Sequence, residues 1–546
     1  MAARQHSLSF SIASWHGDER AVGSPLNGLE LRAMHRTRLF GATGTVLMAI
    51  GALGAGARPV VQDPTFGVRL LNLPSRIQTV SLTMTTTGAV MMALAWLMLG
   101  RFALGPRRMS RSQLDRTLLL WMLPLLIAPP MYSKDVYSYL AQSQITRVGL
   151  DPYKVGPAPG LGLDHVFTSS VPSLWRETPA PYGPLFLWIG RGISALTGEN
   201  VVAAVLAHRL VVLIGVGLIV WATPRLARRC GVAEVTALWL GAANPLLLMH
   251  LVAGIHNEAL MLGLMLTGTE MALRGIDDAR PILPRPPAWP RSAAEWQQWA
   301  PLALVLSGTV LITLSSQVKL PGLLALGFTA MALVGWASGL GFGWLFTLGT
   351  ANVVRSWMSP PTLLALATGQ VGILLGLGDH TTAVLSLTRA MGVLIIAVVV
   401  SWLLLSVLRG RLHPVGGLGV ALGATVLLFP VVQPWYLLWA IIPLAAWATR
   451  PRFRIAAIAG TLIVGIFGPT ANGDRFTLFQ ILDATLASAV IVVLLIGLTF
   501  NRLPWRRVPG TDERYSGEDV DARPGDGPSR QPPASGPARD AYAESP

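Results

Sequence analysis

Long apolar runs separated by short basic connections constrain this chain more than any other feature. Of its 546 residues, 52% are hydrophobic and only 13% are charged, and the mean hydropathy is +0.53. A soluble domain carries about 25% charged residues. A run of about 20 apolar residues can cross a bilayer as a helix, which satisfies its own backbone hydrogen bonds. The sequence therefore predicts an all-α polytopic membrane protein.

We predict about 13–14 transmembrane helices. The apolar runs place spans near residues 39–57, 78–100, 117–132, 201–221, 233–252, 257–273, 300–315, 385–407, 414–431, 436–449, 455–469 and 480–499. Two further crossings must fit into residues 322–353, although two full spans need roughly 40 residues. The number of helices in that stretch stays open.

The basic residues set the expected orientation. The formal net charge is +15, but the Lys and Arg residues lie mostly in short connections between apolar runs, as in the group Arg101, Arg107, Arg108, Arg111 and Arg116. Such connections stay on the cytoplasmic side, so the charge indicates topology and not a nucleic-acid partner. Residues 1–35 are then cytoplasmic, 36–500 form the transmembrane domain, and 133–200 form one long external loop. The polar tail, 501–546, is predicted to be cytoplasmic and disordered.

A carboxylate and several tyrosines meet at the start of this external loop. The segment Asp135-Val-Tyr137-Ser-Tyr139 follows the third apolar run, and Gly149-Leu-Asp151-Pro-Tyr153 comes shortly after. An acidic residue at a membrane boundary needs a partner or a function. Tyrosine prefers such boundaries and offers both a ring and a hydroxyl. The segment predicts a chemical site at the membrane surface.

Further polar and aromatic residues are expected on the same side. They are Tyr182, His256, Asn257, Glu258, Lys319, Gln433, Trp435 and Tyr436. His208 and Arg209 lie about two turns inside the fourth span, and Arg389 has a similar place in a later one. A guanidinium at that depth needs an anion or a water-filled cavity. These cations can hold a lipid phosphate.

This set of residues suits glycosyl transfer from a lipid-phosphate sugar. A carboxylate can take the proton from an acceptor hydroxyl, and cations can stabilise a phosphate leaving group. Attack opposite the leaving group inverts the anomeric centre. No Gly-rich nucleotide loop and no Asp-x-Asp pair is evident in the cytoplasmic connections between the spans. We expect no cofactor and no resident metal, because there is no compact carboxylate cluster, although a divalent metal ion is left open.

The same residues carry a family resemblance. The Asp135 to Tyr153 segment resembles the first-loop signature of GT-C glycosyltransferases, which are multi-span enzymes that use polyprenyl-phosphate sugars. Later segments resemble the actinobacterial α-(1→6)-mannopyranosyltransferases of MptA/MptB type, and are closer to MptB: Tyr182-Gly-Pro-Leu185, Asn244-Pro245, Gly254-Ile-His-Asn-Glu258, Lys319-Leu-Pro321 and Gln433-Pro-Trp-Tyr436. The resemblance covers nearly all of residues 30–500.

The resemblance implies a function and a set of partners. It implies an inverting enzyme of a GT-C-like fold that takes mannose from polyprenyl-phosphate mannose and adds it to an α-mannoside glycolipid. The product would be the mannan core of lipomannan and lipoarabinomannan, made at the periplasmic face of the cell membrane, among membrane lipid. Asp135 matches the catalytic acidic residue of the family motif. The residues expected to bind substrate are Tyr137, Tyr139, Tyr153, Tyr182, His208, Arg209, His256, Asn257, Glu258, Lys319, Arg389, Gln433, Trp435 and Tyr436.

Several alternatives stay open. Asp135 can instead be the N-cap of a loop helix, and Asp63 in the first external loop is a rival catalytic residue. Arg209 can pair with Glu199 or Glu258. At the level of the whole protein, the alternative function is a flippase or transporter of a polyprenyl-linked sugar or lipid, although no internal repeat is evident. A scaffold with a degenerate site is a third hypothesis.

Overall fold

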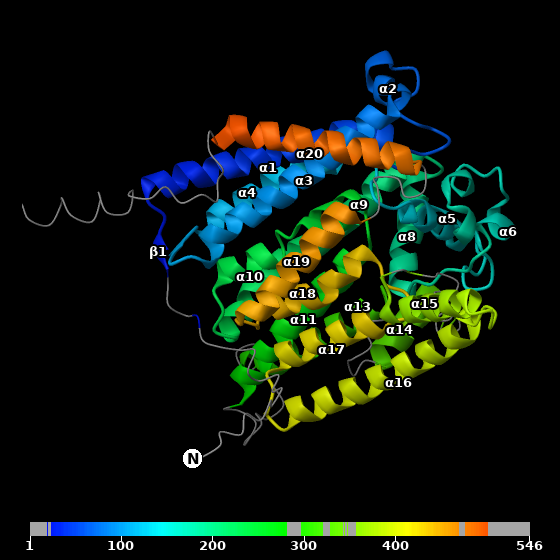
Figure 1. The fold of residues 1–546 in the computed structure, drawn as a ribbon. Helices are drawn as coiled ribbons and strands as arrows, with labels where there is room; N and C mark the ends of the chain where they lie inside the picture. The colour runs from blue at the N-terminus through cyan, green and yellow to red at the C-terminus, as the bar shows by residue number, and fades with distance from the viewer. Residues whose placement is uncertain are drawn as a thin grey trace, which may run out of the picture. The chain divides into compact units, whose positions relative to one another are not determined.

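The structure is a computed structural model that describes residues 19, 23–280, 296–319, 328–341, 343, 347, 356, 358–468 and 476–500. Its described part is almost entirely helical. The two strands, β1 (Ser24–Pro25) and β2 (Arg107–Arg108), form one short parallel pair. The predicted all-α class is therefore confirmed (Figure 1).

The helices follow one another with short connections. In chain order they are α1 (Gly28–Ala55), α2 (Arg69–Arg76), α3 (Gln78–Leu104), α4 (Arg111–Ile127), α5 (Asp135–Arg147), α6 (Pro157–Leu161), η2 (Thr168–Ser170), α7 (Ser173–Arg176), α8 (Pro184–Thr197), α9 (Val201–Arg229), α10 (Glu234–Leu240), η3 (Leu247–Ala253), α11 (Glu258–Ala279), η4 (Gln297–Trp299), α13 (Ala300–Ser316), α14 (Phe328–Ser338), α15 (Pro360–Leu374), α16 (Thr381–Leu408), α17 (Pro414–Leu428), η8 (Pro434–Tyr436), α18 (Leu437–Ala445), α19 (Pro451–Phe467) and α20 (Leu478–Phe500).

Seven of the described helical segments are long and apolar enough to cross a membrane. They are α1, α3, α9, α11, the segment Gln297–Ser316, α16 and α20, and each overlaps one of the predicted spans. The polytopic class is thus confirmed. Other predicted spans fall on shorter helices such as α4, α17 and α19. Half of residues 322–353 lie outside the described part, so the total of 13–14 stays a prediction.

The predicted span at 233–252 is wrong as a single helix. Helix α10 ends at Leu240, and a π-helix, η3, begins at Leu247. Between them, the Asn244 side chain accepts a hydrogen bond from the Leu246 amide at 2.9 Å and donates one to the Leu240 carbonyl at 3.0 Å. Pro245 has no amide hydrogen and disfavours a helical conformation at Asn244. The Asn-Pro pair therefore interrupts the helix. The chain after it forms η3, whose last residue, Ala253, contacts the segment before α5.

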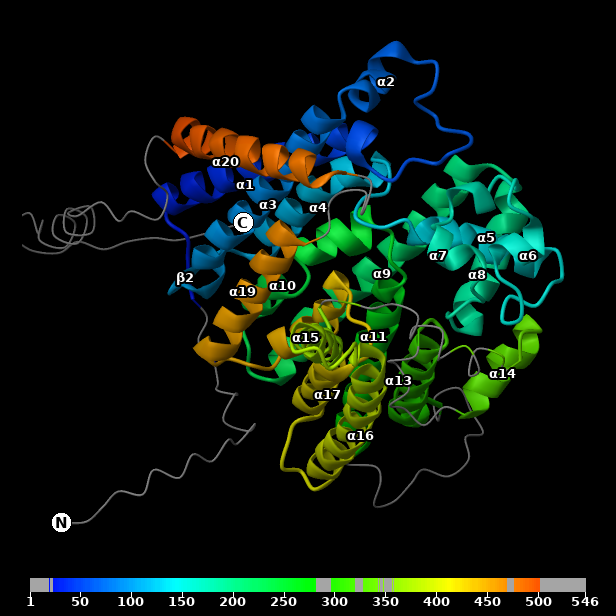
Figure 2. The ribbon, with the colours of Figure 1, turned by 45° about the vertical axis from the view of Figure 1, so that its right-hand side comes forward.

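The N-terminal hairpin packs with the last described helix. Figures 1 and 2 show α1, α3 and α20 side by side, in agreement with the contacts between α1 and α3 and between α3 and α20. Glycines lie where α1 and α3 cross: a Cβ on Gly44 or Gly88 would collide with the backbone of the other helix. Small residues of this kind let membrane helices approach closely.

The predicted external loop is well ordered. Helices α5 and α8 pack together within it, α6 packs on α5, and both α5 and α8 contact α9 (Figure 2). Helix α5 is almost wholly buried from Val136 to Thr146. The loop is thus a folded helical layer that fixes the start of α5 against the rest of the protein.

Candidate functional site

Asp135 is the first residue of α5, and the chain before it makes a sharp change of direction. Helix α4 ends at Ile127, ahead of two consecutive prolines, and the Met131 amide then donates to the Ala253 carbonyl at 3.1 Å. Tyr132 has φ 67°, a left-handed conformation that is costly for a bulky residue. This turn aims the start of α5 at the segment after η3.

The side chain of Asp135 does not cap its helix. Lys134 occupies the N-cap position, and no side chain there makes a capping bond. The Asp135 amide instead donates to the Ser133 hydroxyl oxygen at 3.0 Å. The N-cap alternative is therefore wrong. The carboxylate is about one quarter exposed (26%) and lies at the positive end of the α5 dipole, which favours its charged form.

His256 faces this carboxylate from the turn that leads into α11. Its Nε2 lies 3.6 Å from Asp135 Oδ2, and its Nδ1 lies 2.7 Å from the His250 carbonyl oxygen. Because a carbonyl only accepts, Nδ1 must carry a proton. Nε2 is therefore the nitrogen that meets Asp135. The ring is fully buried and packs on Trp435, with ring centroids 3.6 Å apart.

A buried ion pair lies beside the histidine. Glu258, the first residue of α11, accepts a hydrogen bond from Lys319 Nζ at 2.5 Å and another from Trp435 Nε1 at 2.8 Å, both on Oε1. Burial lowers the pKa of the Lys319 ammonium, but the Glu258 carboxylate and the neighbouring tyrosines raise it by more. The pKa of Lys319 is therefore above its ordinary value, and the ammonium stays charged.

The charge of Asp135 depends on the same neighbours. Burial raises the pKa of its carboxyl group, but His256, Lys319 and the Ser133 hydroxyl together lower it by more. The net pKa lies below the ordinary value of 3.8. Asp135 is therefore an ionised carboxylate at neutral pH and can accept a proton.

Tyrosines form one wall of the cluster. Tyr139 meets Tyr182 edge-on, with ring centroids 5.1 Å apart, and Lys319 Nζ lies 4.9 Å from the centre of the Tyr436 ring. Tyr153 donates to the Tyr182 carbonyl at 3.0 Å. Burial raises the pKa of the Tyr139, Tyr153 and Tyr182 phenols, which stay neutral. Their rings and hydroxyls give the site the surfaces that a sugar requires.

Several buried polar atoms near Asp135 have no hydrogen-bond partner among the described residues. They are His256 Nε2, both amide atoms of the Asn257 side chain, Glu258 Oε2 and Gln317 Oε1. An unsatisfied buried polar atom costs about 1–3 kcal/mol, so native proteins seldom keep several together. These atoms match the alternating donors and acceptors of a polyhydroxylated substrate.

Sequence reasoning missed two residues of this cluster. The carbonyl of His250 fixes the tautomer of His256, and the His250 ring lies 5.5 Å from Trp435 and 5.3 Å from Tyr132. Gln317 lies just before Lys319, and its side-chain oxygen is among the unpartnered atoms. A signal for His250 existed, because it precedes the His-Asn-Glu turn by only six residues.

Other predicted site residues have different surroundings. The Tyr137 hydroxyl donates to the Ala57 carbonyl at 2.6 Å, and His208 Nδ1 lies 2.9 Å from the Ala204 carbonyl. Gln433 is half-buried next to η8. Arg389 is half-buried on α16, which packs against α15 and α17. No described contact joins these four to Asp135, and their roles in substrate binding stay predictions.

The predicted ion pair of Arg209 is wrong. Its guanidinium donates to the carbonyls of Leu126 and Ala128, at 2.6 and 2.8 Å. Glu199 is 3.6 Å from His165 instead, and Glu258 pairs with Lys319. The reason is local: α4 ends against α9, and the last carbonyls of α4 need donors that a buried arginine supplies.

The remaining questions are the role of Asp63 and whether a metal site is present. The rival base Asp63 forms an ion pair with Arg58 at 3.0 Å and accepts two hydrogen bonds from Thr65. Among the described residues, no group of three or more His, Cys, Asp or Glu side chains is placed to hold a metal ion. The Leu-Pro pair after Lys319 lies outside the described residues.

Trp435→Phe tests the bond to Glu258. The change removes a hydrogen bond to a charged group and should lower the free energy of unfolding by about 1.5–3 kcal/mol. Denaturation in mixed micelles, followed by circular dichroism, measures it. The matched control is Trp439→Phe, since Trp439 is also buried but its Nε1 has no hydrogen-bond partner among the described residues. Equal losses in the two variants would mean that packing, and not the bond, sets the effect.

Comparison with known proteins gives the family. Residues 38–335 match the profile described as α-(1→6)-mannopyranosyltransferase, N-terminal domain, and residues 361–497 match the MptB C-terminal domain. The chain is 76% identical to a probable α-(1→6)-mannopyranosyltransferase of Mycolicibacterium smegmatis and 73% identical to an α-(1→6)-mannopyranosyltransferase of Mycobacterium tuberculosis, over the full length of both chains in each case.

A more distant relative is consistent with these matches. The chain is 39% identical to α-(1→6)-mannopyranosyltransferase B of Corynebacterium glutamicum, over 83% of this chain and 80% of the relative. No solved structure matches the chain. The cluster around Asp135 thus lies in a member of a known glycosyltransferase family: the protein belongs to the α-(1→6)-mannopyranosyltransferases and is of the MptB type.

Proposed function

We propose that the protein transfers mannose from polyprenyl-phosphate mannose to the 6-hydroxyl of an α-mannoside glycolipid, with inversion at the anomeric carbon. The observation that carries this is the ionised Asp135 carboxylate at the edge of a buried cluster of unpartnered polar atoms. The cluster offers hydrogen bonds to a sugar, and the carboxylate offers a base. Names of the relatives supply the α-(1→6) linkage.

The proposed step needs one base and one cation. Asp135 takes the proton of the acceptor 6-hydroxyl as its oxygen attacks the anomeric carbon. The bond from that carbon to the phosphate oxygen breaks on the opposite face, and polyprenyl phosphate leaves with the electron pair. Lys319 uses one N–H on Glu258, so its remaining hydrogens can donate to a phosphate oxygen. His256 Nε2 lies 3.6 Å from the carboxylate, and the proton then passes to water.

The membrane supplies the remaining context. The arginines of the predicted cytoplasmic connection, Arg107 and Arg108, precede α4, whereas Asp135 follows it. By the positive-inside rule, Asp135 then faces the periplasm. We propose that the acceptor is the growing mannan core of lipomannan and lipoarabinomannan at that face of the cell membrane.

The donor can be tested with purified protein in liposomes. Radiolabelled polyprenyl-phosphate mannose and GDP-mannose are offered separately with an octyl α-(1→6)-dimannoside. We expect labelled trimannoside from the polyprenyl donor only. Product from GDP-mannose would contradict the proposal. No product from either donor, together with movement of the polyprenyl-linked sugar between the leaflets, would favour a flippase.

The pH profile follows from the lowered pKa of Asp135. Its carboxylate is lost only as pH falls through its folded pKa, which is below 3.8. Between roughly pH 5 and 8, kcat/KM should therefore show no acid limb from this group. Initial rates across that range measure it. An acid limb in that range that persists in the His256→Gln variant would contradict an ionised Asp135.

A further inference from the structure

Gln317 belongs to the polar cluster, but the proposed transfer step does not use it. It follows the last residue of α13, precedes Lys319 by two positions and is fully buried. Its Oε1 atom has no hydrogen-bond partner among the described residues. Such an oxygen has given up its bonds to water and has gained none in return. It is therefore a candidate contact for a ligand.

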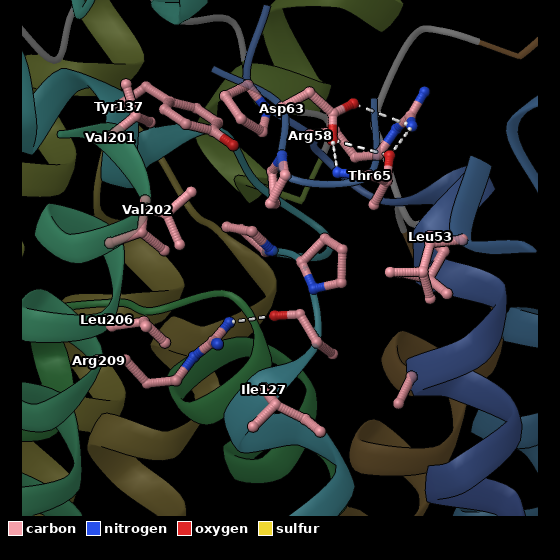
Figure 3. Close-up of a pocket in the computed structure, with 18 of the residues that line it drawn as sticks. Leu53, Arg58, Asp63, Thr65, Ile127, Tyr137, Val201, Val202, Leu206 and Arg209 are labelled. Carbon is pink, nitrogen blue, oxygen red and sulfur yellow. Dashed lines mark hydrogen bonds and ion pairs between the residues drawn. The ribbon is translucent and has the colours of Figure 1, made fainter. Parts of the chain in front are cut away.

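The apolar cavity beside Tyr137 differs, because its charged groups already have partners. The cavity has a volume of about 410 Å³ and is lined by α1, the end of α4 and the start of α9. Figure 3 shows Arg58 paired with Asp63 near its upper end, and Arg209 bonded to a carbonyl at the end of α4. The unpartnered oxygen of Gln317 is the clearer sign of a substrate contact.

The main chain of Gln317 is held by the start of α8. The Leu185 and Phe186 amides both donate to the Gln317 carbonyl, at 3.1 and 3.4 Å. The Gly183 amide donates to the carbonyl of Val318 at 3.1 Å. A Cβ atom on Gly183 would collide with the Gln317 backbone, so glycine permits this close approach. Because the first amides of a helix need such acceptors, Gln317 cannot move away without leaving α8 uncapped.

The hydrogen bonds of Ser316 show which side-chain atom of Gln317 is left over. The Ser316 hydroxyl donates to the Thr313 carbonyl at 2.6 Å, which uses its only hydrogen. Its oxygen can then only accept, so the Gln317 atom that lies 3.2 Å from it is the donor Nε2. The atom without a partner is the oxygen, Oε1. It needs an O–H or N–H group.

This requirement selects among the groups of the proposed substrates. The phosphate oxygens of polyprenyl-phosphate mannose carry no hydrogen at neutral pH, and the polyprenyl chain has no polar atom, so neither can donate to Oε1. A sugar hydroxyl can donate. Lys319, the proposed phosphate ligand, is two residues away, and its Nζ lies 5.9 Å from the centre of the Tyr182 ring. The sugar next to that phosphate is the transferred mannose.

We propose that Gln317 is a specificity-determining residue, whose Oε1 accepts a hydrogen bond from one hydroxyl of the substrate sugar. This role rests on the proposed function and extends it, because it assigns Gln317 to the sugar and not to the phosphate. The transferred mannose is the expected source of the hydroxyl, and the acceptor mannoside is the other source with the same chemistry. Since α8 and Ser316 fix the oxygen before substrate binds, it discriminates against a sugar without that hydroxyl.

Deoxy analogues measure this bond. Each hydroxyl of the mannose in polyprenyl-phosphate mannose is replaced by hydrogen in turn, and so is each hydroxyl of the terminal acceptor mannose except the nucleophile. For every analogue, kcat/KM is determined with the wild type and with Gln317→Met, which has a similar length but no side-chain oxygen. The matched control is Gln144→Met, because Gln144 is also buried but its Oε1 accepts from Ser194 at 2.6 Å. Unfolding curves check the fold of each variant.

With the parent substrates, Gln317→Met should lower kcat/KM about tenfold, which is the upper range for one neutral hydrogen bond. One deoxy analogue should lower the wild-type value by a similar factor but lower the value of Gln317→Met no further, since the bond is already absent. We expect this analogue to be a donor; an acceptor analogue with the same pattern would assign the hydroxyl to the acceptor sugar. Gln144→Met should respond to every analogue as the wild type does.

Ser316→Ala is a second variant that leaves the length of Gln317 unchanged. It removes the bond that orients the amide, so the amide can turn. The preference for the parent substrate over the same deoxy analogue should then fall to about threefold. Binding of each analogue is measured beside the rate by microscale thermophoresis, so that the dependence on the hydroxyl is also read without transfer.

Two results would overturn the proposal. The first is an equal loss in Gln317→Met for the parent substrates and for every analogue, because the residue would then act only through the fold. The second is no loss at all in that variant. Absence of transfer from polyprenyl-phosphate mannose by the wild type would contradict the proposed donor instead, and the binding data would still test Gln317.

Discussion

Asp135→Asn should slow mannosyl transfer by about 10²–10⁴-fold, the usual contribution of a positioned base. The amide has almost the shape of the carboxylate but cannot accept the proton of the acceptor hydroxyl. Since the side chain is one quarter exposed and its oxygen is 3.6 Å from His256, the fold should tolerate the change. The measurement is kcat of the purified variant in liposomes, beside its unfolding curve.

Asp63→Asn is the matched control for this prediction. Asp63 is the rival carboxylate, and its partners Arg58 and Thr65 give it a structural task in the loop after α1. We expect Asp63→Asn to keep most of the activity. If Asp63→Asn abolished transfer and Asp135→Asn did not, the base would have been misassigned, and the proposed mechanism with it.

Lys319→Met should be the most destabilising single change in the cluster. It leaves Glu258, whose side chain is fully buried, with a charge and no cation. Breaking one side of a buried ion pair costs about 3–5 kcal/mol. The double variant Glu258→Gln/Lys319→Met removes both charges and should recover part of the loss. The free energy of unfolding in mixed micelles measures all three forms.

The control for Lys319→Met is Lys154→Met. Lys154 pairs with Asp151 at 3.3 Å, but its side chain is 81% exposed. A surface pair is worth at most about 1 kcal/mol, so this variant should unfold almost like the wild type. Equal stability of Lys319→Met and Lys154→Met would show that the buried pair is not needed to hold the fold.

The membrane-crossing helices could be predicted because each is a long apolar run. Seven of the predicted runs each overlap a helix that is long enough to cross a membrane, since a single segment satisfies its own backbone bonds in hydrocarbon. At the interruption at Asn244-Pro245, the sequence shows a proline. A proline can also kink a membrane helix without ending it. Pro245 alone therefore did not show whether the helix would be kinked or interrupted.

The residues of the site could be predicted from the sequence, but the contacts between them could not. Asp135 was found from its place at the end of an apolar run, among tyrosines. Glu258 and Lys319 were both named, but their ion pair spans 61 positions in the sequence, and no local pattern reports such a contact. One alternative paired Arg209 with Glu199 or Glu258, whereas α4 ends beside it and offers carbonyls instead. That choice depends on packing between helices.

The stereochemistry of transfer tests the central claim most directly. In the proposed single displacement, Asp135 acts only as a base, so an α-linked product requires a β-linked donor. Purified protein is given the β- and the α-anomer of polyprenyl-phosphate mannose, each with the dimannoside acceptor, and the new linkage is determined by proton NMR. We predict that only the β-anomer is consumed and that the product is α-(1→6)-linked. Consumption of the α-anomer with an α-linked product would contradict the account, because retention requires a second displacement and a nucleophile that this mechanism does not contain.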